Sequence, residues 1–404
     1  PGIKETMPEF LLNAPSLDEI GNRLREDWLT RWISDPKQIR STAHMPAVFR
    51  GEDAQQKAAD VAAYLVAGGS RPEEDDVSSP AEIKEGGRIF HQQGCIACHT
   101  LDRKGQLERI GLGGVREKFR KGALAGFLQN PSRFHEGTRM PSFRFSAGEA
   151  TSVASFLFSL GENPKEGSLR GDPARGQMLA RSAGCFNCHQ REGEKGGAGS
   201  KVGLFALGSA ECSGADYNLS GDEKGDLRRF LGEKLHEESL GRFVPAEFAG
   251  RQYHSLRCNA CHARDGEESL RERLAGEVAH LMQPVRAGDE EKPGGLSGPP
   301  PLDHLGMKLR MDWRTKLFAG EIHPKVRKWL PARMPAFPAR AGDLALGFSH
   351  AVGRSGMNSG PSDLDPEKIR TGESMTGVAG GLSCGTCHGI EDKPPIAVFE
   401  GEGP

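Results

Sequence analysis

Cysteine and histidine recur together in four copies of one short pattern, Cys-x-x-Cys-His. The chain has nine cysteines, and the pattern uses eight of them. The copies run from Cys95 through Cys98 to His99, from Cys185 through Cys188 to His189, from Cys258 through Cys261 to His262, and from Cys384 through Cys387 to His388. Thiols at this spacing suit a redox dithiol, half a zinc site, disulfides or the covalent attachment of a haem.

The histidine that always follows the second cysteine separates these possibilities. Zinc sites, dithiols and disulfides do not require that strict adjacency, whereas haem attachment does, because the two thiols bond the porphyrin vinyl groups and the adjacent imidazole ligates the iron. The pattern therefore predicts four covalently bound haem c groups. Such attachment takes place outside the cytoplasm, so we expect an exported protein, periplasmic or extracellular. No charged-then-apolar stretch precedes Pro1, which is typical of a mature N-terminus.

Composition excludes two classes of protein. The 404 residues carry a formal charge of −2, from 53 basic and 55 acidic side chains, whereas a nucleic-acid binder normally has a basic excess. The longest apolar run, 153–160, is broken by serines and is too short to span a bilayer. Apolar residues make up only 36% of the chain, which indicates that something besides side chains fills the cores.

Two further patterns accompany the motifs. A short helix containing glycine is expected before each motif, and the glycine would allow close packing. These helices cover 85–90, 174–179, 248–253 and 370–375, with Gly86-Gly87, Gly176, Gly250 and Gly372. An aromatic helix followed by a Met-Pro loop also occurs three times, at Met45, Met140 and Met334.

Haem motif, then Met-Pro about 40 to 75 residues later, then a closing helix: this order resembles the class I (mitochondrial-type) c-type cytochrome domain. The resemblance implies an all-α fold of tandem small domains, each wrapped around a haem, with histidine and methionine as the axial ligands. It pairs His99 with Met140 and His262 with Met334.

Two halves of this pattern are left over at the chain ends. Met45 has no haem motif before it, and His388 has only 16 residues after it. Joined, they would form one domain with His388 and Met45 as ligands. The expected division is therefore 1–70 and 364–404 as the two halves of a split domain, with complete domains at 80–162, 170–240 and 245–356. Three arrangements stay open: closure between chains, which could give a head-to-tail filament; closure within one chain; and a fragment of a longer cytochrome.

The domain of His189 departs from the pattern, because no methionine lies between His189 and the next motif. Its closing helix is expected at 220–232. The candidates for its second axial position are Cys212, His236 and His254, or no ligand at all.

The sequence favours an electron carrier over an enzyme. Histidine and methionine on three of the four irons leave no position for a substrate, and no catalytic residue is assigned. The partners would then be redox proteins or, in a filament, copies of this chain. The alternative is a multihaem oxidoreductase of peroxidase or sulfur-compound type, with the His189 haem as reaction centre and the others as relay. A subunit that docks to a separate dehydrogenase is a third possibility.

Overall fold

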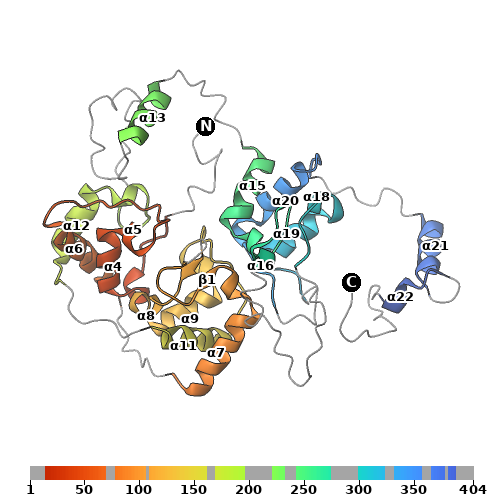
Figure 1. The fold of residues 1–404 in the computed structure, drawn as a ribbon, viewed down its shortest axis with the longest axis horizontal. Coiled ribbons are helices and arrows are strands. Elements are labelled where there is room, and N and C mark those ends of the chain that lie inside the picture. Colours follow the sequence, from red (N-terminus) through yellow and green to blue (C-terminus); the bar gives the residue numbers. More distant parts are fainter. Residues whose placement is uncertain are drawn as a thin grey trace.

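The structure is a computed structural model that describes residues 14–69, 78–105, 109–161, 169–195, 221–232, 243–273, 299–323, 332–356, 365–377 and 381–387. The described chain is mostly helical (Figure 1). Its apolar side chains gather in three cores. No described helix is long and apolar enough to cross a membrane.

The central unit, residues 78–161, is continuous in sequence. Its elements are α7 (Pro80–Gln92), η1 (Cys95–Ala97), β1 (His99–Thr100), β2 (Ile110–Gly111), α8 (Val115–Lys118), α9 (Lys121–Gln129), α10 (Pro131–Phe134) and α11 (Ala147–Ser159). Strands β1 and β2 pair in parallel. Helices α7 and α11 each start with a capping box, at Ser79 and Ser146, and pack against each other.

The composite unit is built from two segments, 14–69 and 169–195, that flank the central unit in sequence. Its elements are α3 (Ile20–Arg23), α4 (Glu26–Ser34), α5 (Pro36–Ile39), α6 (Ala54–Val66), α12 (Pro173–Ser182) and η2 (Cys185–Asn187). Helix α12 packs on α6, and its Ala180 and Phe186 of η2 join the core of the N-terminal segment (Figure 1). The segment that carries Met45 therefore folds with the Cys185 motif.

The third unit spans 243–356. Its described elements are α15 (Pro245–Ser255), η4 (Cys258–Ala260), α16 (Leu270–Arg273), α18 (Leu305–Lys308), α19 (Met311–Ala319), η5 (Pro338–Arg340) and α20 (Ala341–His350). Helix α20 closes over α15 as α11 closes over α7. Outside the three units are α13 (Gly221–Gly232), α21 (Pro366–Thr376) and α22 (Cys384–Cys387), and α21 has no buried residue.

A glycine allows the helices to cross closely in each unit. In two units this glycine lies on the helix before the motif, and in the third it lies on the closing helix. A Cβ at Gly86 would collide with the backbone oxygen of Ser152, and a Cβ at Gly176 with that of Asp60. In the third unit the close approach is made by Gly347 of α20. The prediction that Gly250 and Gly372 have this role is wrong, because a Cβ at either would meet nothing within 4 Å.

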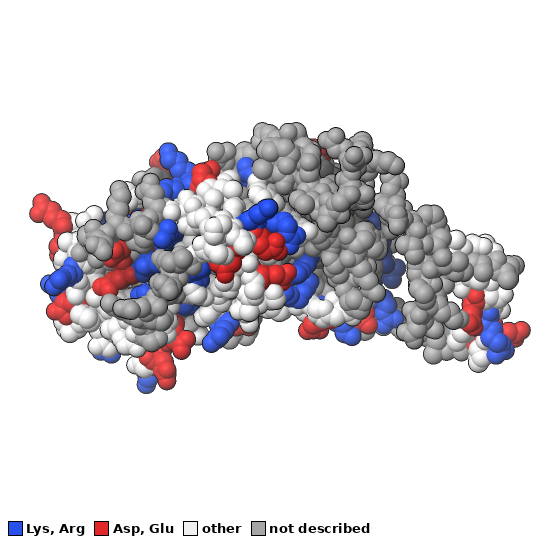
Figure 2. All heavy atoms as spheres, turned by 90° about the horizontal axis from the view of Figure 1, so that it is seen from below, with Lys and Arg blue, Asp and Glu red and all other residues white. Residues whose placement is uncertain are grey.

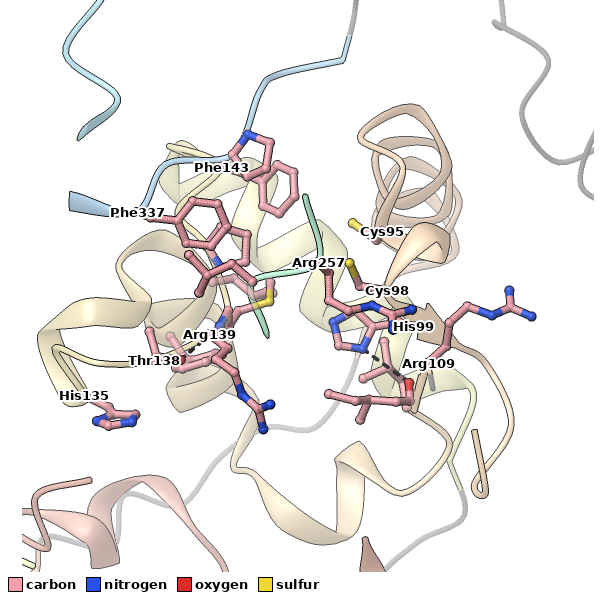
Figure 3. Close-up of a pocket in the computed structure, with 18 of the residues that line it drawn as sticks. Cys95, Cys98, His99, Arg109, His135, Thr138, Arg139, Phe143, Arg257 and Phe337 are labelled. Carbon is pink, nitrogen blue, oxygen red and sulfur yellow. Dashed lines mark hydrogen bonds between the residues drawn. The ribbon is translucent and has the colours of Figure 1, made fainter. Parts of the chain in front are cut away.

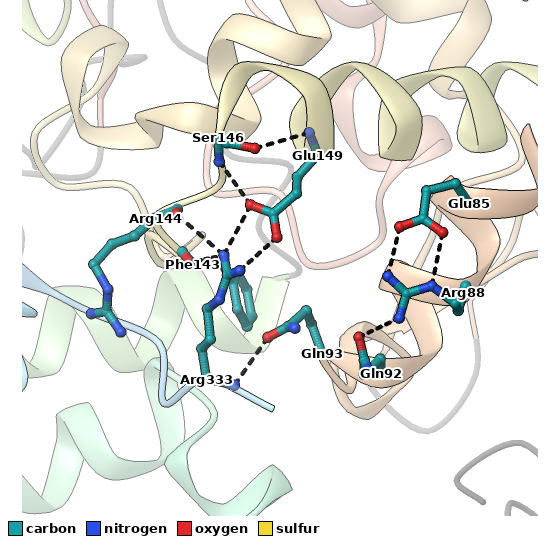
Figure 4. A network of polar contacts seen from close by, with 9 residues as sticks. All are labelled: Glu85, Arg88, Gln92, Gln93, Phe143, Arg144, Ser146, Glu149 and Arg333. Atoms are coloured by element: carbon teal, nitrogen blue, oxygen red, sulfur yellow. Dashed lines mark hydrogen bonds and ion pairs between the residues drawn. The ribbon is translucent and has the colours of Figure 1, made fainter. Parts of the chain in front are cut away.

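The central unit contacts both neighbours. On one side, Leu24 and Phe119 form an antiparallel bridge, and Arg31 pairs with Glu117. On the other side, Ser142 and Ala336 form a second bridge. Figure 4 shows Arg333 of the third unit between Glu149, to which it pairs, and Gln93, which accepts from its backbone N–H. The central unit thus lies between the other two.

Acidic and basic side chains are interspersed on the face shown in Figure 2, with no single-sign patch among its coloured residues. This agrees with the near-neutral formal charge of the chain.

Candidate functional site

The same backbone turn opens all four motifs. The residue before the first cysteine has a positive φ in each, namely Gly94 (69°), Gly184 (72°), Arg257 (62°) and Ser383 (58°). Glycine adopts this conformation without strain, whereas a residue with a Cβ does so at a cost. A short turn over the Cys-x-x segment follows, in η1, η2, η4 and α22.

Three motif histidines are held by backbone carbonyls. The Nδ1 contacts are His99 to Ile110 at 3.3 Å, His189 to Pro15 at 2.8 Å and His262 to Pro300 at 2.7 Å. A carbonyl can only accept, so Nδ1 carries the proton and Nε2 keeps the lone pair that a metal needs. His388 lies outside the described residues.

Burial keeps the central imidazole neutral. Burial, with the charges of Arg40 and Arg257 adding to it, lowers the pKa of His99 to about 4, although its bond to Ile110 acts in the opposite direction. A neutral imidazole is the form that ligates iron.

The three histidines line one cavity of about 2210 Å³. Figure 3 shows this cavity around His99. A single small-molecule site usually has roughly 300–1,000 Å³, so this space is larger than one such ligand needs. All three Met-Pro methionines line it too: Met45, Met140 and Met334. The cavity thus brings together three histidines and three methionines, the side chains that His/Met ligation of a haem requires.

Each methionine packs on the core of one unit. Met140 lies against the central core, Met334 against the third, and Met45 against the core that includes Phe186, on which Cys185 also packs. The Nε1–H of Trp32 donates to the sulfur of Met45 at 3.1 Å. Trp32 also stacks on Trp28, with ring centroids 5.2 Å apart, so the donor is fixed in place.

The segment that carries Met45 packs differently from the expected division of the chain. We expected 1–70 to complete the Cys384 motif, with His388 as the partner of Met45, and 170–240 to form a domain of its own. The structure instead joins 14–69 to 169–195, and Leu17 donates its N–H to Gln190 just after the Cys185 motif. Helix α6 takes the closing position expected for 220–232, and the described side chains of α13 are exposed or half-exposed.

Of the three sequence candidates for the second ligand at His189, the structure describes only His254. Cys212 and His236 lie outside the described residues. His254 lies on α15 of the third unit, where it contacts Asn259 at 3.4 Å and Glu267 at 3.8 Å. Met45, in contrast, packs on the same core as Phe186 and Cys185 of the second motif.

The thiols do not fit the other chemistries. Burial raises the pKa of Cys95 to about 12 and that of Cys185 to about 11, whereas a redox dithiol needs a lowered pKa. A structural zinc needs four ligands. Among the described residues, no three Cys, His, Asp or Glu side chains converge on one metal position.

The motifs of neighbouring units approach each other across the cavity. Burial raises the pKa of Cys258 to about 12, and the thiols of Cys261 and Cys98 add to this effect. Because Cys98 acts on Cys258, a thiol of the first motif lies near a thiol of the third. On the other side, burial, Arg340 and His189 lower the pKa of His135 to about 4, so the second motif also faces the central unit.

Sequence reasoning missed the three carbonyls that orient the imidazoles. Pro15 and Pro300 lie in proline-containing segments, which indicate loops in the sequence. Ile110 has no such signal.

Comparison with known proteins gave no match: no family model, curated protein or solved structure matches this chain.

Proposed function

We propose that this chain is a multihaem c-type cytochrome that carries electrons outside the cytoplasm. One observation carries the proposal: three motif histidines with Nδ1–H fixed to a carbonyl line the same cavity as three Met-Pro methionines. The resemblance to class I cytochrome c domains and the four Cys-x-x-Cys-His motifs support covalent haem as the cofactor.

The haem would supply a reversible one-electron iron couple. The chain's own residues do the rest. The cysteines would bond the porphyrin, the carbonyls of Ile110, Pro15 and Pro300 orient the imidazoles, and the apolar cores exclude water. A methionine as second ligand raises the reduction potential and occupies the position a substrate would take.

The ligand pairs in this proposal are His99 with Met140, His262 with Met334 and His189 with Met45. The last pair explains why no methionine follows His189 in sequence: the methionine comes before it, on the other segment of the composite unit. This pairing favours an electron carrier over an enzyme, because the haem proposed as a reaction centre has a methionine beside its motif.

Spatial order differs from chain order in this proposal. The motifs follow one another as His99, His189 and His262 in sequence, but the central unit, with His99, lies between the other two. Electrons that enter at either outer unit would pass through the central one. The redox partners would therefore dock at the composite or the third unit.

The proposal is a discrete carrier and not a filament closed through the split domain. The N-terminal segment expected to receive the tail of a neighbouring chain is already covered by α12 of its own chain. The Cys384 motif would attach the fourth haem.

The test is haem content, measured by mass spectrometry and by the pyridine haemochrome on protein made with a cytochrome c maturation system. Four covalent haems per chain are expected, and a chain without covalent haem contradicts the proposal. Carbon monoxide is then added to the reduced protein. Rapid binding at the His189 haem would favour the oxidoreductase instead.

A further inference from the structure

The Met-Pro loops of the central and third units pair with each other. The N–H of Ser142 donates to the carbonyl of Ala336 at 3.0 Å, and the N–H of Ala336 donates to the carbonyl of Ser142 at 2.9 Å. Each residue lies two positions after the methionine of its unit, Met140 or Met334. Because the pairing is antiparallel, the two methionines enter the bridge from opposite ends. The two loops therefore form one hydrogen-bonded element.

An arginine of the third unit holds the loop before Met140. Arg340 is 4% exposed, and its guanidinium donates to the carbonyl of Gly137 at 2.7 Å and to that of Thr138 at 3.3 Å. The hydroxyl of Thr138 in turn accepts the N–H of Met140 at 3.2 Å. Hydrogen bonds from a charged donor are stronger than those between neutral groups. The backbone that leads into Met140 is therefore fixed by a buried side chain of another unit.

The central unit holds the loop of Met334 in the same way. Arg333, directly before Met334, donates to the carbonyls of Phe143 and Arg144 at 3.2 Å each and pairs with Glu149 at 2.5 Å (Figure 4). The carboxylate of Glu149 is itself fixed, because it belongs to the capping box that begins α11. The guanidinium of Arg144 makes a longer contact, 3.5 Å, with the carbonyl of Met334. The backbone around Met334 is thus attached to the start of α11.

The composite unit meets the central unit through other segments. The Nε–H of Arg25 donates to the carbonyls of Arg116 at 3.1 Å and Phe119 at 3.2 Å, and Leu24 forms the bridge to Phe119. These residues border α3, α4 and α8 and lie outside the Met-Pro loops. Both sides of the central unit are therefore joined by an arginine on backbone carbonyls, but the contact with the third unit is the one that includes two methionine loops.

We propose that the central and third units position each other's methionine ligands. Arg340 of the third unit is a positioning residue for Met140. Glu149 of the central unit, through Arg333, is one for Met334. Because the loops are hydrogen-bonded together, release of one methionine from its iron would weaken the hold on the other. The inference rests on the proposed function, since it needs haems bound at both units, and it makes these two haems a coupled pair.

The test is a titration of the haem-loaded full chain, in the ferric form, with imidazole, which competes with methionine for the iron. Loss of the sulfur-to-iron charge-transfer band measures binding, and Met140→Ala and Met334→Ala each lack one step of the titration and so assign the haems. Arg340→Gln should raise the imidazole affinity of the Met140 haem about tenfold, the equivalent of one hydrogen bond from a charged group. Arg340→Lys should restore part of the loss, since an ammonium can reach one carbonyl. A purely structural role would act first on Met334, the methionine of its own unit.

Glu149→Gln tests the opposite direction at a half-buried position. Glutamine also serves in a capping box, so α11 keeps its start, while the charge that pairs with Arg333 is removed. The imidazole affinity of the Met334 haem should rise severalfold and that of the Met140 haem should change less. The matched control is Arg25→Gln, which removes arginine-to-carbonyl bonds on the other side of the central unit and should leave both affinities unchanged.

The two methionine variants test the coupling itself. Met334→Ala should raise the imidazole affinity of the Met140 haem, and Met140→Ala should raise that of the Met334 haem by the same factor, because coupling between two binding equilibria is reciprocal. No change in either variant would overturn the coupling. Haem-loaded Arg340→Gln and Glu149→Gln with the affinities of the Arg25→Gln control would overturn the inference alone. A wild-type chain without covalent haem would overturn the proposed function as well.

Discussion

The composite unit and the central unit contain the same parts in opposite chain order. In the central unit the Cys95 motif comes first and Met140 follows; in the composite unit Met45 comes first and the Cys185 motif follows after an intervening unit. Yet Gly86 and Gly176 each lie nine residues before the first cysteine and each meet the backbone of the closing helix. The core depends on which helices meet and not on how they are connected.

The difference between the two units lies in what joins their halves. In the central unit, the chain itself links α7 to α11. In the composite unit the two segments are distant in sequence, and buried carboxylates connect them. Asp60 of α6 accepts from Arg175 of α12, and Glu194 accepts from Tyr64 of α6 and from Arg181 of α12. Separate segments thus gain specific polar contacts that a continuous unit does not need.

The largest expected effect is that of Met45→Ala. The variant should lose roughly a third of the sulfur-to-iron charge-transfer band, because three Met-Pro methionines contribute to it, and should gain one haem that binds carbon monoxide. Met140→Ala should show the same loss. Met178→Ala is the control, since this methionine of α12 is 65% exposed. An unchanged band in Met45→Ala would mean that His189 has another partner.

The helix crossing gives the next largest effect. Gly176→Ala and Gly86→Ala should each lower the free energy of unfolding by about 1–3 kcal/mol or more, because the new methyl group collides with backbone. Gly250→Ala, on a helix with open space around it, should instead stabilise by about 0.5–1 kcal/mol. Chemical denaturation measures all three. Equal losses in the two glycine variants would support equivalent crossings, and tolerance of Gly176→Ala would argue against the composite unit.

Acid should weaken the composite unit more than the central one. Arg181, and then Tyr64, hold the pKa of Glu194 at about 2, and although burial opposes it, hydrogen bonds from Arg175 and the Asp172 N–H hold that of Asp60 below its usual value. A carboxyl with a lowered pKa stabilises the fold above its ordinary pKa, and that stability is lost as the pH falls through the folded value. The loss should therefore develop from about pH 4.5 to about pH 2.

Hydrogen exchange resolved by helix measures this loss, with α6 expected to open before α11. Glu194→Gln should lower the protection of α6 at neutral pH and bring its acid sensitivity closer to that of α11. Equal acid sensitivity of α6 and α11 in the wild type would show that the carboxylates do not hold the two segments together.

The smallest effect is expected from Trp32→Phe. Trp32 and Phe127 each lie thirteen residues before the methionine of their unit, so the variant gives the composite unit the residue of the central one. It removes the N–H···S bond to Met45, which should lower the free energy of unfolding by about 0.5–1.5 kcal/mol. The charge-transfer band should shift slightly and keep its amplitude. Loss of the band would mean that the indole positions the ligand and does more than support it.

Sequence reasoning predicted the local elements well. The helices before and after the motifs, the Met-Pro loops and the mostly helical fold follow from helical periodicity and from short motifs that act locally. The pairing of segments depends on long-range packing, which periodicity does not encode. Three incomplete pieces were present, at Met45, His189 and His388, and the sequence alone does not decide which two of them belong together.

The basic side chains that line the cavity show the same limit. Arg40, Arg139 and Arg257 belong to three units and have no common motif, so only their arrangement in space brings them to one cavity. The positive φ of Arg257 is likewise a property of the fold, although its place before Cys258, where two other motifs have glycine, was visible in the sequence.

An experimental structure of the haem-loaded protein tests the central claim most directly, by locating the second ligand of the iron bound to His189. The sulfur of Met45 is predicted at bonding distance from that iron, with Trp32 still donating to it. A different ligand there, such as Cys212 or a residue from outside the composite unit, would contradict the account.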